Sequence, residues 1–311
     1  MSEQLYKLDA LPSPTDERDY QAEEIFPADL SLPKVFDPRL KLLDIRDQGA
    51  QGSCVAQATA CLKEIQEKKN VGFEDYMSPQ FVYNNRYNQP GEGMYPRDSM
   101  SILYKKGIVP EEEYPYGKRD TAEQIPRSVL EKAANYKVKG YAYVSTIETM
   151  KAAIYRSGAC CITFSVFNAR PNFWKPSSPT EPIQGGHATV AVGWNETGFI
   201  IRNSWGESFG DRGYVVFPYE EWNLRGEVWT LIDDESSKPD PKYSKWHWKA
   251  WRAITNTVKN IKNTKYVLFL SWIFSIVISI IEQPLALIWI PATLIFVSIW
   301  SWRKKLYMAK G

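Results

Sequence analysis

The chain has 311 residues, enough for one large domain or for two domains of about 100 to 200 residues each. Its 38 Lys and Arg against 36 Asp and Glu give a net charge of +2, so no overall field attracts nucleic acid, and nucleic-acid binding is not expected. The four cysteines include an adjacent pair and no metal-type C-x-x-C pair, which argues against a disulfide framework or a metal site and indicates a reducing compartment.

The N-terminal residues 1–30 are rich in Pro, Asp and Glu and carry only scattered apolar positions. This composition predicts an irregular strap over a surface, or a short pro-segment, and it lacks the apolar stretch of a signal peptide. A folded domain is expected over residues 31–232.

The first half of that domain is predicted to be helical. Apolar and small residues recur at helical spacing from Cys54 to about residue 69, with Ser53 as a plausible N-cap. A second helix is expected from Ser78, and a third over 96–106, closed by a glycine.

The second half changes character after about residue 124. Short runs rich in β-branched and aromatic residues predict strands, interrupted by one helix over 147–157. The runs are YKVKGYAYV, CCITFSVF, HATVAVGW, GFIIRNSW and GYVVFPYE. The prediction is therefore an α+β fold of a helical half and an antiparallel β half, with a cleft between them.

The C-terminal part predicts membrane attachment. Residues 233–264 read as a polar linker and a basic, Trp-rich membrane-proximal segment, and 303–311 as a basic tail. Between them, 265–302 contain two apolar runs of about 24 to 27 Å if helical, which predicts a transmembrane hairpin of two spans. Lysines and arginines flank the hairpin at both ends. By the positive-inside rule, both ends of the hairpin and the catalytic domain are therefore expected on the cytoplasmic side. A re-entrant hairpin, or two buried helices of a soluble protein, are the alternatives.

Cys54 is the first candidate for chemistry. It stands where the polar, glycine-broken loop DIRDQGAQGS meets an apolar helix, and the free N–H groups at a helix start favour a thiolate. The alternative is that Cys54 is a small core residue, because free cysteine is often buried. A thiolate nucleophile needs a base, and only His187 and His247 exist. Since His247 lies in the membrane-proximal segment, His187 is the candidate base, although a lone histidine beside glycines is often structural.

Three blocks in this order, DQGAQGSCVA, GGHATVAVGW and NSWGESFGDRGY, resemble the papain family of cysteine peptidases. The resemblance extends from about residue 32 to about residue 230, and it includes MSPQFVYN, GEGMYP and KKGIVPEEEYPY. It implies a two-subdomain papain-like fold. It implies no cofactor and no metal.

The resemblance also implies roles for individual residues. Cys54 would be the nucleophile, His187 its imidazolium partner, and Asn203 the acceptor that orients the imidazole. Gln48 would donate its side-chain amide to the oxyanion, and Trp205 would shield the hydrogen bond between Asn203 and His187 from solvent. Substrate backbone would be bound by three further residues: Gly93, Met94 and Gly186.

Three positions depart from the family pattern. Gln51 replaces a cysteine that forms a disulfide in secreted members, and Val55 replaces the usual tryptophan after the nucleophile. Met94 stands where glycine is common, which predicts a narrower non-primed subsite. Too few residues precede the domain for a long inhibitory propeptide, so regulation by propeptide removal is not expected. A strap formed by residues 1–30 would be a weaker substitute for such a propeptide.

The function expected from these residues is that of a membrane-tethered cysteine endopeptidase acting on protein or peptide substrates. Two alternatives use the same fold. One is a binding or scaffold module with little hydrolysis, and the other is isopeptide cleavage or amide transfer on the same residues.

Overall fold

The computed structural model describes residues 6–26, 31–117 and 122–232, all of which belong to one compact unit. Within these ranges, no helix is both long enough and apolar enough to cross a lipid bilayer. The segments for which a linker, a membrane hairpin and a basic tail are predicted, 233–264, 265–302 and 303–311, lie outside the described residues.

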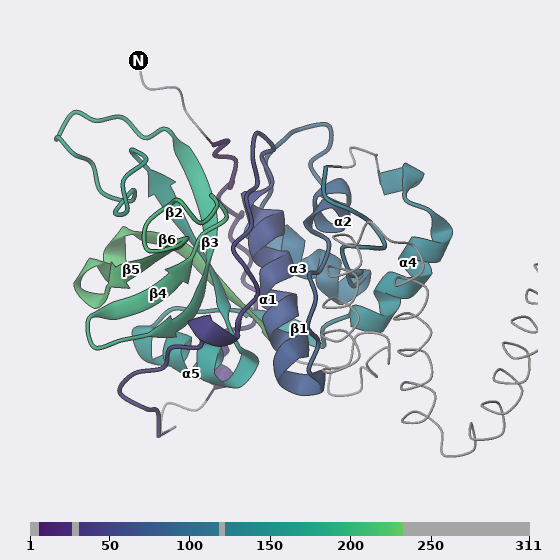
Figure 1. Cartoon of the computed structure of the whole chain (residues 1–311), viewed down its shortest axis with the longest axis horizontal. Coiled ribbons are helices and arrows are strands. Elements are labelled where there is room, and N and C mark those ends of the chain that lie inside the picture. Colours follow the sequence, from purple (N-terminus) through teal and green to yellow (C-terminus); the bar gives the residue numbers. More distant parts are fainter. Residues whose placement is uncertain (1–5, 27–30, 118–121, 233–311) are drawn as a thin grey trace, which may run out of the picture. The chain divides into compact units, whose positions relative to one another are not determined.

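Helices form one side of the unit, with α1 between them and the sheet (Figure 1). The three predicted helices are confirmed as α1 (Cys54–Val71), α2 (Pro79–Asn84) and α3 (Pro96–Lys105). A fourth, α4 (Arg127–Ala133), was not predicted, because it is short and buries only two apolar side chains. Short 3-10 turns are found at Ala22–Glu24, Arg39–Lys41, Ala122–Gln124, Ala134–Tyr136 and Tyr219–Leu224.

The cap predictions have different outcomes. The Ser78 hydroxyl accepts a hydrogen bond from the Phe81 N–H, as an N-cap should. The prediction for Ser53 is wrong in its chemistry: the residue precedes α1, but its side chain makes no capping bond. Its hydroxyl lies 2.6 Å from the Tyr116 hydroxyl instead. A tertiary partner has replaced the local one.

A six-stranded antiparallel sheet forms the other side, in the order β1-β6-β2-β3-β4-β5. All five predicted strands are confirmed. The sixth was missed because its first residues are charged or glycine and its partners lie far away in the sequence. The strands are β1 (Gly140–Tyr143), β2 (Cys160–Val166), β3 (Gly185–Trp194), β4 (Gly198–Arg202), β5 (Tyr214–Pro218) and β6 (Arg225–Ile232).

Both faces of the sheet are covered, so alternate side chains enter two different cores. Cys161, Val190 and Ile200 pack in the core that contains α1. Cys160, Ile162 and Ile201 pack in the second core, with the predicted helix α5 (Ile147–Ser157). The helical face of the sheet is therefore the one against which the helix of Cys54 is placed.

Candidate active site

Cys54 is the first residue of α1 and is fully buried. The backbone N–H of Ala188, next to His187 on β3, lies close enough to the Cys54 thiol to favour its anion. The packing of α1 against β3 thus brings the predicted nucleophile to the strand of the predicted base.

His187 and Asn203 lie side by side on neighbouring antiparallel strands, β3 and the end of β4. His187 Nε2 is 2.8 Å from Asn203 Oδ1, and the same oxygen accepts the Ser204 N–H at 2.7 Å. Because the Ser204 bond identifies Oδ1 as the acceptor, Nε2 carries the imidazole proton. Nδ1 is buried and has no hydrogen-bond partner among the described residues, so it is the nitrogen left to take a proton.

Trp205 stacks on the His187 ring, with centroids 4.3 Å apart and planes inclined by 22°. Phe173 and Phe209 pack around the indole, which is itself almost fully buried. This aromatic cage excludes water from one side of the imidazole, and a hydrogen bond is electrostatically stronger in such a low-dielectric setting.

The Gln48 side chain is held at both ends. Its Oε1 accepts the Ser204 hydroxyl at 2.8 Å, and its Nε2 donates to the Gln51 carbonyl at 3.2 Å and to the Lys7 carbonyl at 3.0 Å. The predicted oxyanion donor therefore already binds a carbonyl oxygen, which comes from the N-terminal part of the chain.

The N-terminal strap, here residues 6–26, lies across the predicted substrate-binding residues. Ala10 N donates to the Gly186 carbonyl at 3.0 Å, while Met94 exchanges hydrogen bonds with Asp9 O and Leu11 N at 3.0 and 2.9 Å. Both contacts are parallel bridges. A Cβ on Gly93 or Gly186 would stand 2.7 or 2.1 Å from a strap carbonyl, so glycine allows this close approach.

Burial keeps both predicted reacting groups neutral in this form. It raises the pKa of the Cys54 thiol, with a further small rise from the Asp9 carboxylate, although backbone N–H groups of Ala188 and Asp9 act the other way. Burial also lowers the pKa of His187 to about 4, against the opposing effect of the Asn203 hydrogen bond. In this closed arrangement, burial therefore favours the neutral thiol and the neutral imidazole over the ion pair.

Several residues of the site were missed by the sequence analysis. Ser204 orients Gln48, and Tyr6 covers Trp205 by a parallel stack with centroids 4.8 Å apart. Lys7 and Asp9 occupy the cleft. The position of Ser204 between Asn203 and Trp205 was an available signal, whereas nothing in the strap's composition indicates where it docks.

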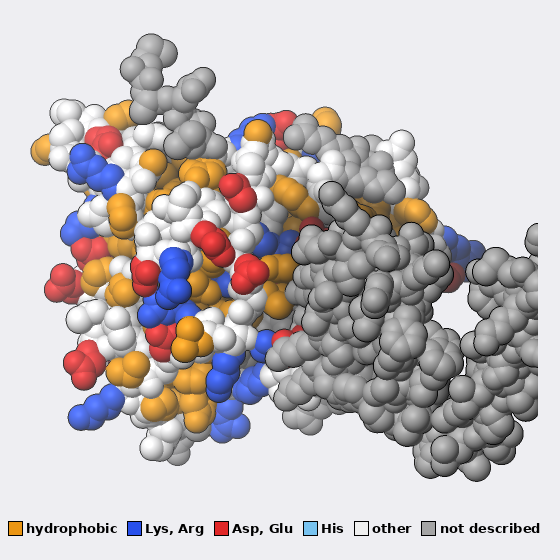
Figure 2. Space-filling view, viewed as in Figure 1, with side chains coloured by type: hydrophobic (Ala, Val, Ile, Leu, Met, Phe, Trp, Pro, Cys, Tyr) orange, Lys and Arg blue, Asp and Glu red, His pale blue; other side chains and the backbone are white. Residues whose placement is uncertain are grey.

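Neither a large charged patch nor a metal-type cluster accompanies this site in the part of the chain that the structure describes. Basic, acidic and apolar side chains are interspersed over the described part of the face in Figure 2, without a large patch of one sign. Among the described residues, no group of His, Cys, Asp and Glu has an arrangement suited to a metal ion.

Comparisons with known proteins agree in pointing to one family. Residues 32–226 match the papain family of cysteine proteases. An uncharacterised peptidase C1-like protein of Acanthamoeba polyphaga mimivirus is 29% identical over 212 residues, which cover 60% of this chain and 68% of that protein. A cysteine protease of Blomia tropicalis is 32% identical over 207 residues, 59% of this chain and 60% of the relative.

Solved structures show the same fold. Xylellain, a cysteine protease from Xylella fastidiosa, has a TM-score of 0.61 at 25% identity, covering 75% of this chain and 99% of the other. A Carica candamarcensis cysteine protease in complex with E-64 has a TM-score of 0.53 at 20% identity. The match covers 65% of this chain and 100% of the other. The predicted papain-like α+β fold is confirmed, and the chain belongs to the papain family of cysteine proteases.

Proposed function

We propose that this protease is an endopeptidase that hydrolyses peptide bonds with Cys54, His187, Asn203 and Gln48. The observation that supports it most directly is the bond from His187 Nε2 to Asn203 Oδ1, which leaves Nδ1 as the base, on the strand that lies against Cys54. Nucleophile, base, orienting acceptor and oxyanion donor are the groups that acyl transfer through a thiolate requires.

The chemistry then follows from these atoms. His187 Nδ1 takes the Cys54 proton as Sγ attacks the peptide carbonyl carbon, and Gln48 Nε2 and the Cys54 N–H bind the oxyanion. The imidazolium protonates the leaving amine as the C–N bond breaks, which leaves a thioester. Water then gives a proton to Nδ1 and attacks the thioester, and the departing sulfur regains its proton.

We propose further that the described arrangement is a closed form. Asp9 places its N–H near the thiol, while the Lys7 carbonyl takes the Gln48 amide. A substrate with its amino-terminal side along Met94 would run opposite to the strap, whose residue numbers rise from Gln48 towards Met94. Residues 6–11 must therefore leave before substrate binds.

The activity is tested with the full chain on a general peptide library and with a thiol-directed epoxide. Cys54→Ala should abolish both cleavage and labelling, and Cys61→Ala, a buried cysteine on the same helix, should retain both. Cleavage retained by Cys54→Ala would contradict the proposal. Binding without turnover would support a scaffold module, and turnover of branched isopeptides or transfer to an added amine would support the alternative chemistry.

The closed form is tested by loosening the strap without touching the reacting groups. Ala10→Pro removes the N–H that donates to Gly186 and should increase the rate of epoxide labelling at Cys54. Thr15→Pro is the matched control, because Thr15 lies on the exposed side of the same strap. Equal rates for the wild type and Ala10→Pro would contradict a closed form.

We also propose that residues 265–302 tether the protease to a membrane as a hairpin of two spans, with the catalytic domain on the cytoplasmic side. The support is the pair of apolar runs with Lys and Arg at both ends. Ile276→Lys with Ile295→Lys should release the protein from membranes under alkaline extraction. Protection of the catalytic domain from protease added on the cytoplasmic side would contradict the orientation.

A further inference from the structure

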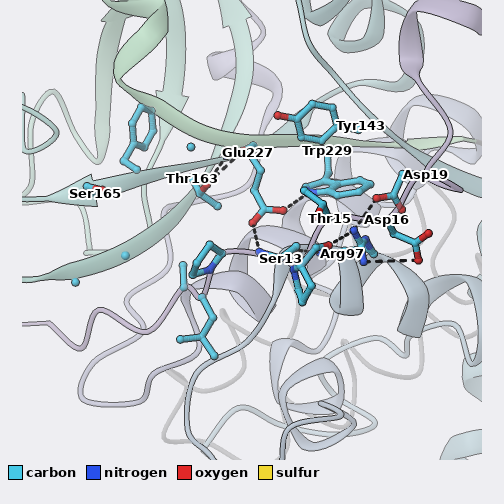
Figure 3. Close-up of a pocket in the computed structure, with 18 of the residues that line it drawn as sticks. Ser13, Thr15, Asp16, Asp19, Arg97, Tyr143, Thr163, Ser165, Glu227 and Trp229 are labelled. Atoms are coloured by element: carbon cyan, nitrogen blue, oxygen red, sulfur yellow. Dashed lines mark hydrogen bonds and ion pairs between the residues drawn. The ribbon is translucent and has the colours of Figure 1, made fainter.

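The strap covers a second feature beside the cleft, a cavity of about 860 Å³ between residues 8–21 and the strands β2, β3 and β6. Figure 3 shows its polar wall, where Arg97, at the start of α3, faces Asp16 and Asp19 of the strap. Glu227 and Trp229 of β6 line the same space.

The Arg97 guanidinium binds acidic groups of the strap. It lies 2.7 Å from Asp19 and 4.0 Å from Asp16, and it also donates to the Pro14 carbonyl. Its side chain is only 16% exposed, and the guanidinium carbon lies over the Trp229 ring, 5.9 Å from the centroid. Asp19 is therefore the main ion-pair partner of Arg97, while Asp16 is held more closely by Arg18, at 2.7 Å, and lies at the edge of the Arg97 pair.

The start of α3 adds to this preference for anions. The Arg97 backbone N–H donates to the Ser13 hydroxyl at 3.2 Å, and it belongs to the first turn of a ten-residue helix. The helix dipole favours negative charge at this end, and the Arg97 N–H becomes available when Ser13 leaves. Arg97 Nε is buried and has no hydrogen-bond partner among the described residues, so the guanidinium keeps unused donor capacity.

The carboxylates of Glu227 and Asp98 lie near Arg97 without pairing with it in this arrangement. Glu227 accepts the Ser13 N–H at 2.8 Å and the Trp229 indole N–H at 2.6 Å, and neither Glu227 nor Asp98 forms an ion pair with Arg97 within the described part of the chain. When the strap leaves, Arg97 therefore loses its ion-pair partners while Trp229 stays beneath it. A half-buried cation in this state favours a new carboxylate.

Arg97 is also within reach of a bound substrate. It follows Met94 by three residues, at most about 11 Å of extended chain. Leu11 of the strap pairs with Met94, and Ser13 already contacts Arg97. On the strap, Lys7 contacts the oxyanion donor Gln48, and Ser13, six residues further on, contacts Arg97. An extended peptide on the non-primed side therefore reaches Arg97 within about six residues of the scissile bond.

Resting on the proposed peptidase function, we propose that Arg97 determines specificity by selecting substrates with Asp or Glu two to six residues before the scissile bond. The strap docks by the same chemistry that would recognise such a substrate, so the acidic strap and an acidic peptide compete for one cation.

The test compares matched peptides in the full-length enzyme, with Glu or Gln at each of these positions. The ratio of kcat/KM for the Glu and Gln peptides cancels any change in strap opening, because both peptides meet the same opened fraction of enzyme. The wild type should favour Glu by about tenfold or more, Arg97→Gln should bring the ratio near one, and Arg97→Glu should favour Lys over Glu. Lys105→Gln, an exposed change on the same helix, should leave the ratio unaltered.

A wild-type ratio near one, or a ratio that survives in Arg97→Gln, would overturn the proposal even if peptides are cleaved. If no peptide is cleaved, the peptidase function fails separately, and binding decides the role of Arg97. Fluorescent Glu and Gln peptides are then compared on the full chain carrying Cys54→Ala with Asp16→Asn and Asp19→Asn, which frees Arg97. Equal affinities there would also overturn it.

Discussion

The helix that carries Cys54 and the strand that carries His187 are both buried, but their surroundings differ in polarity. Behind α1 lie charged groups: Lys63 is fully buried, 2.6 Å from Glu67, and bonds to the Lys137 carbonyl at 3.2 Å. Arg46, in the loop before Cys54, lies within 2.6 Å of both Glu64 and Glu111. Paired charges thus hold α1 and the loop before it, which together form the helical wall of the cleft.

The sheet wall of the cleft, formed by β3 with His187, is held by strand pairing and by the packing of aromatic side chains. His187 pairs with Phe164 across β2 and β3, and Phe164 packs against Phe173, Trp174 and Phe217. Ring packing tolerates small losses, whereas a buried charge that loses its partner is left with its full desolvation cost. The helical wall should therefore be the more sensitive one to a single polar substitution.

The largest effect is expected at Lys63. Lys63→Met leaves the Glu67 carboxylate buried without its cation and should lower the free energy of unfolding by about 3–5 kcal/mol. Urea denaturation measures the change. The double variant Lys63→Met/Glu67→Leu should recover most of the loss, and failure to recover it would show that packing, not charge, sets the cost.

Lowering the pH should destabilise the sheet wall through His187, with a somewhat smaller loss in the free energy of unfolding. The folded-state pKa of His187 is lowered to about 4, below about 6.5 in an unfolded chain. The folded state therefore favours the neutral ring, and its stability is complete above pH 6.5 and is lost as pH falls towards 4. The loss should amount to roughly 3 kcal/mol over that window.

Denaturation at a series of pH values measures this loss, with His187→Gln as the non-titrating control. Ala10→Pro, which should let water reach the ring, is expected to reduce the dependence. Identical pH profiles for the wild type and His187→Gln would rule out His187 as its source.

A smaller effect is expected at Ser204, which joins the two walls through Gln48. Ser204→Ala removes the hydroxyl that donates to Gln48 Oε1 and frees the amide to rotate. Because one neutral hydrogen bond contributes about 0.5–1.5 kcal/mol, kcat should fall roughly 2- to 13-fold. Steady-state kinetics should show little change in KM, and a change in KM alone would indicate a binding role.

The smallest effect is expected at Arg127, whose pair with Glu131 has the same i,i+4 spacing as Lys63 and Glu67 but has side chains 92% and 64% exposed. Arg127→Met should change the free energy of unfolding by no more than about 0.5 kcal/mol. A loss as large as that of Lys63→Met would mean that burial does not explain the difference between the pairs.

Elements with their own periodic or alternating pattern were predictable from the sequence. The helix 147–157 was predicted with the bounds that α5 has, and the strand runs were found from their β-branched and aromatic residues. α4 and β6 were not predicted, because one is too short to show a period and the other depends on distant partners. Ser53 failed as a cap for a similar reason, since Tyr116 binds its hydroxyl.

By itself the sequence determined the α+β class and the order of Cys54, His187 and Asn203 along the chain, because helix starts, strand runs and the motifs around these residues are local patterns. Only the tertiary structure decided that the strap fills the cleft, that burial keeps the thiol and imidazole neutral, and that Arg97 meets Asp16 and Asp19. Hydrogen bonds and burial between residues far apart in the chain leave no periodic signal in the sequence.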